Sequence, residues 1–267
     1  MSEKIAIAIS GAAGRMGRRL IALGSAEDNL KIAAAWDSPS HPDFGADSGQ
    51  LAGIGPNGVP IRSITDDSTP VDVIIDFSTP AATDELIAQA LKRRSALVYA
   101  TTGAAAGQME ALRQAAKTIP VLWSPSMSMT VNLTMLLAQT AARALADKDA
   151  DVEIIEKHHR FKADAPSGTA LKFGRLIAEE MGIDGAVFGR EGKTGARPHN
   201  QIGYHAVRIG DNPGEHTILF GLLGETIELT VKATNRDAYA VGALRCAEFL
   251  AGKPAGEIYS MNDVLNL

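Results

Sequence analysis

The sequence predicts an α/β protein made of a doubly wound parallel sheet and a second, α+β region. In the first half, short β-rich runs alternate with helical patterns, which is typical of a parallel sheet wound with helices. From about residue 128 an apolar helical stretch leads into strand-like runs separated by short turns, which favours a mostly antiparallel sheet. Because the chain has 267 residues, two domains of ~100–200 residues each are expected.

In the first half, hydrophobic patterning predicts five strands and three helices. The strands are expected at residues 4–10, 31–37, 71–77, 95–103 and 119–124, and the helices at 15–26, 80–93 and 106–117. Glycine and proline punctuate residues 38–70, so this stretch is predicted to be a loop with a short strand or two.

The second half opens with an apolar helix, predicted over residues 130–147. Strands are expected at residues 151–157, 203–210, 215–221 and 225–233. Ser167 is a natural N-cap for a helix that ends at Gly182. The apolar positions of that helix are Leu171, Ile177 and Met181. A last helix near residues 238–251 and the tail after it could belong to either domain.

The overall composition excludes several classes of protein. A net charge of −5 and a pI near 5.7 argue against nucleic-acid binding, because neutralising backbone phosphates needs a basic face. The single cysteine, Cys246, cannot form an intramolecular disulfide and is predicted to be a buried helical thiol of an intracellular protein. No apolar run approaches the ~18–20 residues that span a bilayer, and the amino-terminal run is too short for a signal peptide. We therefore expect a cytoplasmic protein without nucleic-acid or membrane partners.

A glycine-rich turn joins the first predicted strand to the first helix. Gly11, Gly14 and Gly17 follow the strand, where backbone N–H groups and the positive end of a helix can approach a pyrophosphate. Asp37 ends the next strand, where a carboxylate can accept from ribose hydroxyls. The spacing is not the commoner G-x-G-x-x-G, and a turn without a ligand is the competing interpretation. The whole pattern favours a dinucleotide on a Rossmann-type domain.

The residue after Asp37 bears on which dinucleotide is bound. A 2′-phosphate is usually met by arginine or lysine beside the acidic position, and here that residue is Ser38, which favours NADH. Arg15, Arg18 and Arg19 could still reach a phosphate, so NADPH stays open.

Small and hydroxyl residues also follow three other predicted strands, at residues 76–79, 100–103 and 124–127. In an open parallel sheet, ligands bind beyond the carboxyl ends of the strands, so these residues could let a cofactor lie close. Ordinary turn chemistry before a helix is the alternative.

A second concentration of reactive residues lies in the segment EIIEKHHRFKADAPSGTAL. An imidazole, from His158 or His159, can donate a proton near neutral pH, and Lys162 supplies a positive charge. The backbone N–H groups of Gly168 and Thr169, at a predicted helix start, can receive a carboxylate or a phosphate. Structural histidines, a solvated lysine and a simple cap are the competing interpretations. Their concentration in one short segment favours a site.

Two other kinds of site are disfavoured. Zinc would have His199, His205 and His216 available, but no H-x-x-x-H or C-x-x-C spacing occurs and adjacent histidines chelate poorly. A Ser-His-Asp hydrolase is disfavoured because the sequence lacks a G-x-S-x-G motif. We expect no metal.

The run E-I-I-E-K-H-H-R-F-K-A-D-A-P-S-G-T-A resembles the signature of the 4-hydroxy-tetrahydrodipicolinate reductase family, long called dihydrodipicolinate reductases. The resemblance spans nearly the whole chain through GAAGRMG, DFSTP, TTG, REGKTGAR, GEHTILF and MNDVL. It implies an NAD(P)H-dependent reduction of (4S)-4-hydroxy-2,3,4,5-tetrahydrodipicolinate, a cyclic imine with two carboxylates, to tetrahydrodipicolinate with loss of water. That step belongs to the diaminopimelate route to lysine.

The resemblance also implies a domain organisation. Residues 1–127 and 238–267 would form the dinucleotide-binding domain, and residues 128–237 would form an inserted domain for substrate binding. The sheet of the inserted domain would mediate a homotetramer.

The resemblance further assigns roles to individual residues. His158 would be the proton donor and Lys162 its catalytic partner. The substrate carboxylates would be bound by His159, Gly168 and Thr169. The cofactor contacts would come from Gly11, Ala12, Ala13, Gly14, Arg15, Met16, Asp37, Ser38, Ala100, Thr101, Thr102, Ser124, Pro125, Ser126 and Met127.

The sequence departs from the family pattern in three places. The run Ser126-Met127-Ser128-Met129-Thr130 replaces a pattern that usually has asparagine first and glycine last, and it bears on the nicotinamide pocket and the interdomain hinge. Ala100 replaces a usual glycine. Ser38 stands where NADPH-using members often carry arginine, in agreement with NADH. A reductase of another cyclic imine or oxo acid and a non-catalytic NAD(P)-binding sensor are the alternative functions.

Overall fold

The computed structural model describes residues 3–267, which form two compact units. One unit runs to Met129 and also contains Asp237–Leu267, and the other is Thr130–Arg236. The last helix therefore belongs with the first half of the chain, a point that hydrophobic patterning alone left open.

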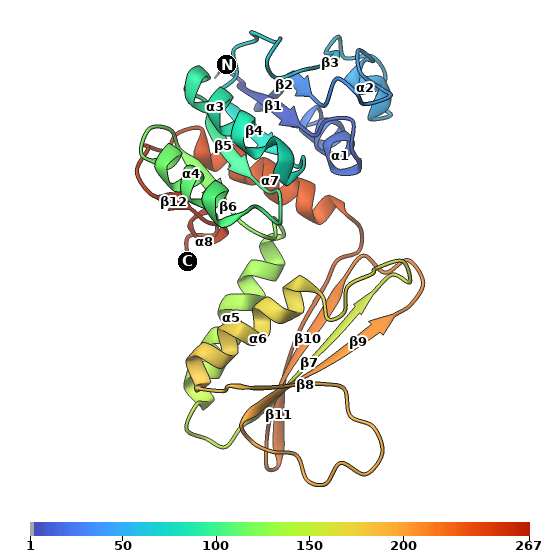
Figure 1. Ribbon diagram of the computed structural model, residues 1–267, viewed down its shortest axis with the longest axis vertical. Coiled ribbons are helices and arrows are strands. Elements are labelled where there is room, and N and C mark those ends of the chain that lie inside the picture. The colour runs from blue at the N-terminus through green and yellow to red at the C-terminus, as the bar shows by residue number, and fades with distance from the viewer. Residues whose placement is uncertain (1–2) are drawn as a thin grey trace. The chain divides into compact units, whose positions relative to one another are not determined.

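The first unit is a seven-stranded parallel sheet with helices on both faces (Figure 1). The strands are β1 (Ile5–Ser10), β2 (Leu30–Trp36), β3 (Ile61–Arg62), β4 (Val73–Asp76), β5 (Ala96–Tyr99), β6 (Val121–Trp123) and β12 (Ile258–Tyr259). The helices are α1 (Arg15–Gly24), α2 (Ser48–Leu51), the 3-10 turn η1 (Pro80–Ala82), α3 (Thr83–Arg93), α4 (Ala106–Ala116), α7 (Asp237–Leu250) and α8 (Met261–Val264). The strand order is β12-β6-β5-β4-β1-β2-β3, so the order reverses between β1 and β4. Ligands of such sheets bind at the carboxyl ends of the strands at that reversal.

Each face of this sheet has its own hydrophobic core. Ile7 and Ile9 of β1 pack with residues of α1 and α7, whereas Ala8 between them packs with residues of α3 and α4. Strands that are buried on both faces are apolar throughout, which explains why the sequence showed them as continuous apolar runs. Cys246 is fully buried within α7, as predicted, and burial raises the pKa of its thiol to about 12.

The first unit differs from the sequence prediction in detail. Residues 38–70 contain α2 as well as the short strand β3. The strands predicted at 95–103 and 119–124 are shorter, because the parallel ladder ends where Tyr99 pairs with Asp76 and Trp123. The residues beyond those positions are turns at the carboxyl edge of the sheet.

The second unit contains a five-stranded sheet in the order β11-β10-β7-β9-β8. Its strands are β7 (Asp151–His158), β8 (Gly185–Phe188), β9 (Gln201–Arg208), β10 (Glu215–Leu222) and β11 (Glu225–Lys232), and its helices are α5 (Met129–Leu145) and α6 (Gly168–Met181). As predicted, β10 is antiparallel to β11 and runs opposite to β9; β9, however, pairs in parallel with β7, which lies between it and β10. The helix α6 carries the chain back along the sheet after β7, and such a crossover connects parallel strands. The edge strand β8 was absent from the sequence prediction.

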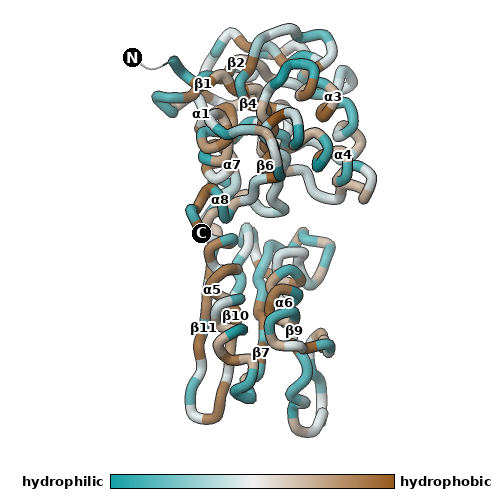
Figure 2. The backbone as a smooth tube through the Cα atoms, turned by 90° about the vertical axis from the view of Figure 1, so that its left-hand side faces the viewer, coloured by the Kyte–Doolittle hydropathy of each residue, from teal (hydrophilic) through white to brown (hydrophobic). Residues whose placement is uncertain are grey.

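The two helices of the second unit cover one face of its sheet. Both helices run along the strands of this sheet (Figure 2). Hydrophobic residues of α5 and α6 pack there on inward-facing side chains such as Ile154, Ile218 and Phe220. On the opposite face, no helix of residues 130–236 covers the half-exposed side chains of Ile155 and Leu219. One face of this sheet is therefore uncovered within the chain.

The ends of α6 agree with the capping residues in the sequence. The side chain of Ser167 accepts a hydrogen bond from the N–H of Ala170, and Gly182 has the positive φ of a left-handed cap. Of the apolar positions of this helix, Ile177 is buried, whereas the side chain of Leu171 is exposed. The buried face instead contains Gly174, where an added Cβ would lie 1.7 Å from the hydroxyl oxygen of Tyr204. The close approach of that tyrosine sets the rotation of the helix.

Candidate active site

The glycine turn after β1 is held by close backbone contacts. Gly11 has φ +77°, and a Cβ there would lie 2.6 Å from the carbonyl oxygen of Phe77. A Cβ on Gly17 would lie 2.2 Å from the carbonyl oxygen of Gly11. Both positions therefore require glycine, and the turn brings its backbone to the reversal point between β1 and β4.

Asp37 completes this turn from the end of β2. Its Oδ2 accepts from the N–H of Ala13 at 2.9 Å, and its Oδ1 accepts from the N–H of Ser38 at 2.8 Å. A cavity of about 610 Å³ opens beside it at the carboxyl edge of the sheet. Gly11, Gly14, Asp37 and Ser38 contribute to its lining. The predicted glycine turn and acidic residue thus share one cavity.

The three arginines of α1 differ in their partners. Arg18 donates to Asp43 at 2.5 Å and to the carbonyl oxygen of Ala13, and Arg19 makes a bidentate pair with Asp237 at 2.7 and 2.8 Å. Arg15 is exposed and has no recorded ion-pair partner among residues 3–267. Two of the three are therefore already neutralised by carboxylates.

The other predicted cofactor residues follow β5 and β6 and differ in accessibility. Thr101 is buried and donates through Oγ1 to Asp76 at 2.6 Å, while Thr102 is exposed. Ser124 is buried and donates to the carbonyl oxygen of Ser126 at 2.7 Å.

Several predicted cofactor residues have buried side chains. The side chain of Met127 packs in the core, its sulfur 3.9 Å from that of Cys246. Met127 can therefore offer a ligand only its backbone. The same holds for Ala12 and Ala100, which are also buried, whereas Met16 is half-buried and Pro125 exposed.

Polar contacts that the sequence did not indicate support the wall of the cavity. The guanidinium of Arg93 lies 4.9 Å from the ring centre of Trp36 and donates to the carbonyl oxygens of Ile64, Asp67 and Thr69. The indole nitrogen of Trp36 in turn donates to the Asp67 carboxylate at 2.8 Å. The cavity wall at Ile64 is thus held by an arginine from the end of α3, and no local sequence pattern links these positions.

In the second unit, His158 ends β7 beside a buried carboxylate. Its Nδ1 lies 2.6 Å from Oε2 of Glu156, which is fully buried. Arg208 of β9 donates to both oxygens of Glu156, at 2.7 and 2.8 Å, and the N–H of Ser167 donates to Oε1 at 3.0 Å. The carboxylate therefore joins two strands to the start of α6.

A second histidine approaches from β10. His216 lies opposite Glu156 in the antiparallel ladder, and its ring centre is 5.3 Å from that of His158. Its Nε2 lies 3.0 Å from Oγ of Ser167. Since Oγ already accepts from Ala170, its hydroxyl hydrogen is free to donate to His216. Burial lowers the pKa of His216 to about 4, so this ring is neutral near pH 7.

The remaining predicted site residues lie around these groups. Lys162 pairs with Asp164 at 2.8 Å, and Asp164 is largely exposed. The Nδ1 of His159 is buried without a hydrogen-bond partner in the described part of the chain. Gly168 is exposed and Thr169 half-buried at the first turn of α6, where backbone N–H groups have no intrahelical acceptor. The histidine pair, the lysine and the helix start therefore gather at the carboxyl end of β7.

Burial and the neighbouring carboxylate have opposite effects on the pKa of His158. Burial disfavours the charged ring and lowers its pKa below the usual 6.5, while the hydrogen bond to Glu156 acts against this shift. Burial would likewise raise the pKa of Glu156, but hydrogen bonds from Arg208 and His158 outweigh it and lower that pKa. Glu156 is thus an ionised carboxylate inside the protein.

The histidines considered for zinc have other partners. His205 lies 2.7 Å from Glu153, and His199 lies 3.0 Å from Asp149. Across residues 3–267, no group of three or more histidine, cysteine, aspartate or glutamate side chains is arranged to hold a metal ion.

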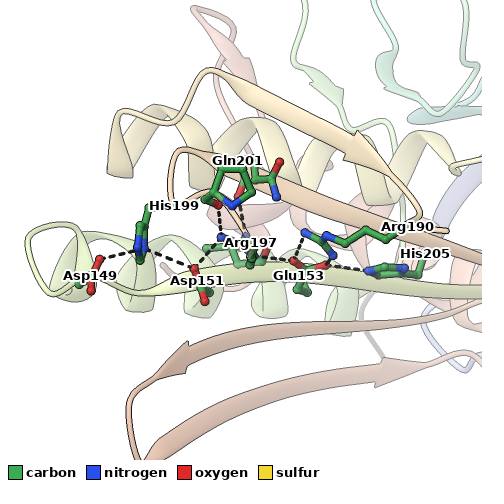
Figure 3. Close-up of polar contacts among 10 residues, drawn as sticks. Asp149, Asp151, Glu153, Arg190, Arg197, His199, Gln201 and His205 are labelled. Carbon is green, nitrogen blue, oxygen red and sulfur yellow. Dashed lines mark hydrogen bonds and ion pairs between the residues drawn. The ribbon is translucent and has the colours of Figure 1, made fainter. Parts of the chain in front are cut away.

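The REGKTGAR motif folds onto β7 through Glu153. Arg190 makes a bidentate pair with this carboxylate, at 2.8 and 3.0 Å, and Arg197 donates to it at 2.8 Å (Figure 3). Arg197 also pairs with Asp151 at 2.6 Å and donates to the carbonyl oxygens of residues 152, 198 and 201. We call Glu153, Arg190, Arg197 and His205 the Glu153 cluster; it holds both ends of the loop between β8 and β9.

Replacing Arg197 with Met should free this loop, because five hydrogen bonds are lost: three to residues of β7 and two to the backbone carbonyls of residues 198 and 201. We expect trypsin to cleave after Lys193 about tenfold faster, corresponding to ~1.4 kcal/mol of lost local stability. The rate is measured by mass spectrometry of timed digests. Arg175→Met, at an exposed arginine of α6, is the matched control; equal rates in both variants would contradict the assignment.

The stabilisation that the ionised Glu153 carboxylate gives to its cluster should persist at low pH. Partial burial acts to raise the pKa of Glu153, but hydrogen bonds from Arg190, Arg197 and His205 outweigh it and lower the pKa from 4.5 to about 2. Because the folded-state pKa is depressed, the stabilisation is complete above the unfolded value and is lost as the pH falls through about 2.

The parallel sheet with its glycine turn, and the histidine–carboxylate pair beside a helix start, define a two-domain oxidoreductase with a nicotinamide-nucleotide-binding domain. A family model described as dihydrodipicolinate reductase, N-terminus, matches residues 5–127, and one described as dihydrodipicolinate reductase, C-terminus, matches residues 130–265. The chain belongs to the dihydrodipicolinate reductase family, as the sequence motifs indicated.

Individual relatives are similar in sequence to this chain over nearly its full length. The chain is 52% identical to the 4-hydroxy-tetrahydrodipicolinate reductase of Rhodopirellula baltica, with 98% of this chain and 96% of the relative covered. It is 47% identical to the reductase of the same name from Alkalilimnicola ehrlichii, with 98% of each covered. Among solved structures, it is similar to dihydrodipicolinate reductase from Paenisporosarcina sp. TG-14, with a TM-score of 0.78, 26% identity, and coverage of 96% of this chain and 97% of that one.

The helices of residues 3–267 were also compared with the length and hydropathy that a membrane span needs. None of them is both long and apolar enough to cross a membrane.

Proposed function

We propose that the protein reduces (4S)-4-hydroxy-2,3,4,5-tetrahydrodipicolinate to tetrahydrodipicolinate with loss of water, in the diaminopimelate route to lysine. The observation that carries this proposal is the position of His158, bonded to a buried Glu156 that also bonds the start of α6. A proton donor thus lies beside a receptor for carboxylates. The names of both curated relatives support it, as does the Paenisporosarcina reductase, which was solved with dipicolinate bound.

The residues of the second unit suit each step of this reaction. The substrate loses its hydroxyl group and one hydrogen as water, and the resulting ring takes up one hydride and one proton. When bound, the nicotinamide cofactor supplies the hydride. His158 supplies the proton from Nε2, the ring nitrogen not bonded to Glu156.

The two substrate carboxylates need cationic or N–H partners. We assign them to Lys162, His159 and the N–H groups of Gly168 and Thr169. The unpartnered, buried Nδ1 of His159 is a polar atom that a ligand can satisfy. Lys162 would exchange Asp164 for substrate, which costs little because an exposed ion pair is worth only ~0–1 kcal/mol.

The cofactor assignment rests on the cavity beside the glycine turn. Its lining combines close backbone approach at Gly11 and Gly14 with the carboxylate of Asp37, a donor and acceptor set that fits a dinucleotide. The turn from Gly11 to Met16 would hold the pyrophosphate. The residues at 100–102 and 124–127 would contact the rest of the molecule.

We propose NADH as the preferred cofactor. The carboxylate of Asp37 would accept from the ribose hydroxyls and would repel a 2′-phosphate. Ser38 offers no positive charge, and Arg18 and Arg19 are paired with Asp43 and Asp237. Only Arg15 of the three helix arginines has no recorded acidic partner in residues 3–267, so little positive charge is available for the extra phosphate.

Replacing Ser38 with Arg should raise the affinity for NADPH relative to NADH about tenfold, because one charge-assisted hydrogen bond to a phosphate is worth ~1.5–3 kcal/mol. Ser38 is exposed, so the longer side chain fits without repacking. Dissociation constants for both cofactors are measured by fluorescence titration. Ser38→Gln, which has length without charge, is the control, and an equal shift in both variants would count against the assignment.

The function itself is tested by following oxidation of NADH and NADPH with the freshly made product of dihydrodipicolinate synthase. We expect turnover with at least one cofactor. Absence of turnover with either one would overturn the proposal, and cofactor binding without any turnover would favour a sensor. Turnover with another cyclic imine alone would favour a related reductase.

We also propose a homotetramer formed through the uncovered face of the second sheet. Ile155 and Leu219 are half-exposed on that face, and the Glu153 cluster holds a loop at its edge. Covering this face with another copy would bury apolar surface. Light scattering after size exclusion should give four times the chain mass of 28.0 kDa. Leu219→Lys, which places a charge on this face, should lower the measured mass. A monomer mass for the unmodified protein would refute the assembly.

A cytoplasmic location completes the proposal. The thiol of Cys246 is buried and free, as suits a compartment that keeps thiols reduced. Cell fractionation of the source organism tests this, and recovery in an extracytoplasmic fraction would contradict it.

A further inference from the structure

The carboxylate of Glu156 has four hydrogen-bond donors around it. Oε1 accepts from Nη2 of Arg208 at 2.7 Å and from the N–H of Ser167 at 3.0 Å. Oε2 accepts from Nη1 of Arg208 at 2.8 Å and lies 2.6 Å from Nδ1 of His158. A carboxylate paired with a bidentate arginine is ionised and can only accept. The hydrogen in the remaining contact must therefore be carried by Nδ1.

This contact determines the tautomer of His158. With its hydrogen on Nδ1, the neutral ring has its lone pair on Nε2, and the charged ring releases its proton from Nε2. Among residues 3–267, no hydrogen-bond partner is recorded for Nε2. Nε2 is therefore the nitrogen that can exchange a proton with a bound ligand.

The register of the strands places these groups on one face of the second sheet. Arg208 lies beside His158 in the parallel ladder of β7 and β9, and His216 lies opposite Glu156 in the antiparallel ladder of β7 and β10. The same face carries the core under α6, whose N-cap is Ser167. Glu156 thus touches both the proton donor and the helix start.

We infer that Glu156 is the positioning residue of this site: it holds His158 with Nε2 free to deliver the proton and fixes that ring relative to the carboxylate receptor at the start of α6. This inference rests on the proposed role of His158 as proton donor. Glu156 acts through His158 and Ser167.

The charged and titratable groups around His158 set the sign of each expected change. Glu156 favours the charged ring, whereas Arg208 and Lys162 disfavour it. His216 on β10 is neutral near pH 7 and adds no charge. Burial already holds the pKa of His158 below its usual range. Removal of Glu156 should therefore move this pKa further down, and removal of Arg208 should move it up.

The test follows the His158 ring by NMR titration of the full-length protein, without substrate, alongside the pH profile of kcat/KM. In Glu156→Gln we expect the titration of His158 to move down by about 1–3 pH units, because an opposite charge in contact is removed. We expect kcat to fall by about tenfold or more while KM changes less. In Arg208→Met the titration should move up. Glu156→Asp keeps the charge, so its His158 should titrate close to the pH seen in the unmodified protein. If the amide variant does not fold, a Glu156→Asp titration that moves up toward the value of a solvated imidazole would overturn the inference.

A merely structural role for Glu156 predicts a different result. Loosening the site would expose His158 in both variants and move both titrations in the same direction, toward the value of a solvated imidazole. Shifts of the same sign, or an unchanged titration in Glu156→Gln, would overturn the inference. The NMR measurement needs no turnover, so a failure of the proposed reaction would be seen separately, as opposite titration shifts in a protein inactive toward the substrate.

Discussion

Replacing His158 with Gln should lower kcat by about 10²–10⁴-fold, the usual contribution of a positioned general acid. The ring lies at the end of β7 with Nδ1 bonded to Glu156, so glutamine can keep a polar contact there but cannot deliver a proton from Nε2. Cofactor binding should be unchanged, because the glycine turn and its cavity belong to the other unit. Steady-state kinetics and a cofactor fluorescence titration measure both quantities.

The matched control for this variant is His199→Gln. His199 is exposed and pairs with Asp149, away from the carboxyl end of β7. We expect the control to keep full activity. A His158→Gln enzyme within a few fold of the unmodified rate would show that the proton comes from elsewhere.

The pH dependence of activity should differ between the free protein, which kcat/KM reports, and the substrate complex, which kcat reports. The pKa of His158 is lowered by burial, so in the free protein its charged form is lost below the usual 6.5. A bound dicarboxylate would favour the charged ring. Because the donor must be protonated, activity falls as pH rises, and this fall should come at higher pH for kcat than for kcat/KM.

Replacing Gly17 with Ala should weaken dinucleotide binding about tenfold or more, or ~1.4 kcal/mol, and lower the free energy of unfolding by ~1–3 kcal/mol. The added Cβ would lie 2.2 Å from the carbonyl oxygen of Gly11 and 2.6 Å from Cα of Ala12. Both are backbone atoms, so the turn itself must shift. Isothermal titration with NADH and urea unfolding provide the two values.

Gly107→Ala in α4 is the control for Gly17→Ala. A Cβ at Gly107 meets no heavy atom within 4 Å, so this change should leave binding intact and raise stability by ~0.5–1 kcal/mol. Unchanged NADH affinity in Gly17→Ala would mean that the turn does not hold the dinucleotide.

Much of the fold was predictable because its signals are local. Hydrophobic patterning located the five longer strands of the parallel sheet, β1, β2, β4, β5 and β6, since these apolar runs are largely buried on both faces. It did not locate the short edge strand β12. Ser167 and Gly182 marked the ends of α6 because capping depends on a few neighbouring residues. The parallel pairing of β9 with β7 and the existence of β8 were missed, because strand pairing depends on residues far apart in the chain.

The candidate site was predictable in part for the same reason. Asp37 and the glycine turn follow from a short spacing, and the motifs of the chain indicated the family that full-length relatives confirm. Glu156 was overlooked although the alternation Val152, Ile154, Glu156 and His158 places a carboxylate on the buried side of a strand. A charged residue at a buried position is the signal that could have revealed it.

By itself, the sequence determined most of the elements, the caps of α6, the glycine turn and the family. Only the tertiary structure decided which side chains meet: Arg208 and His216 come from strands about 50 and 60 residues after Glu156, and Ser167 from the helix between. The physical reason is that a buried carboxylate must be paired and hydrogen-bonded, and its partners are chosen by strand register and helix crossover rather than by sequence neighbours.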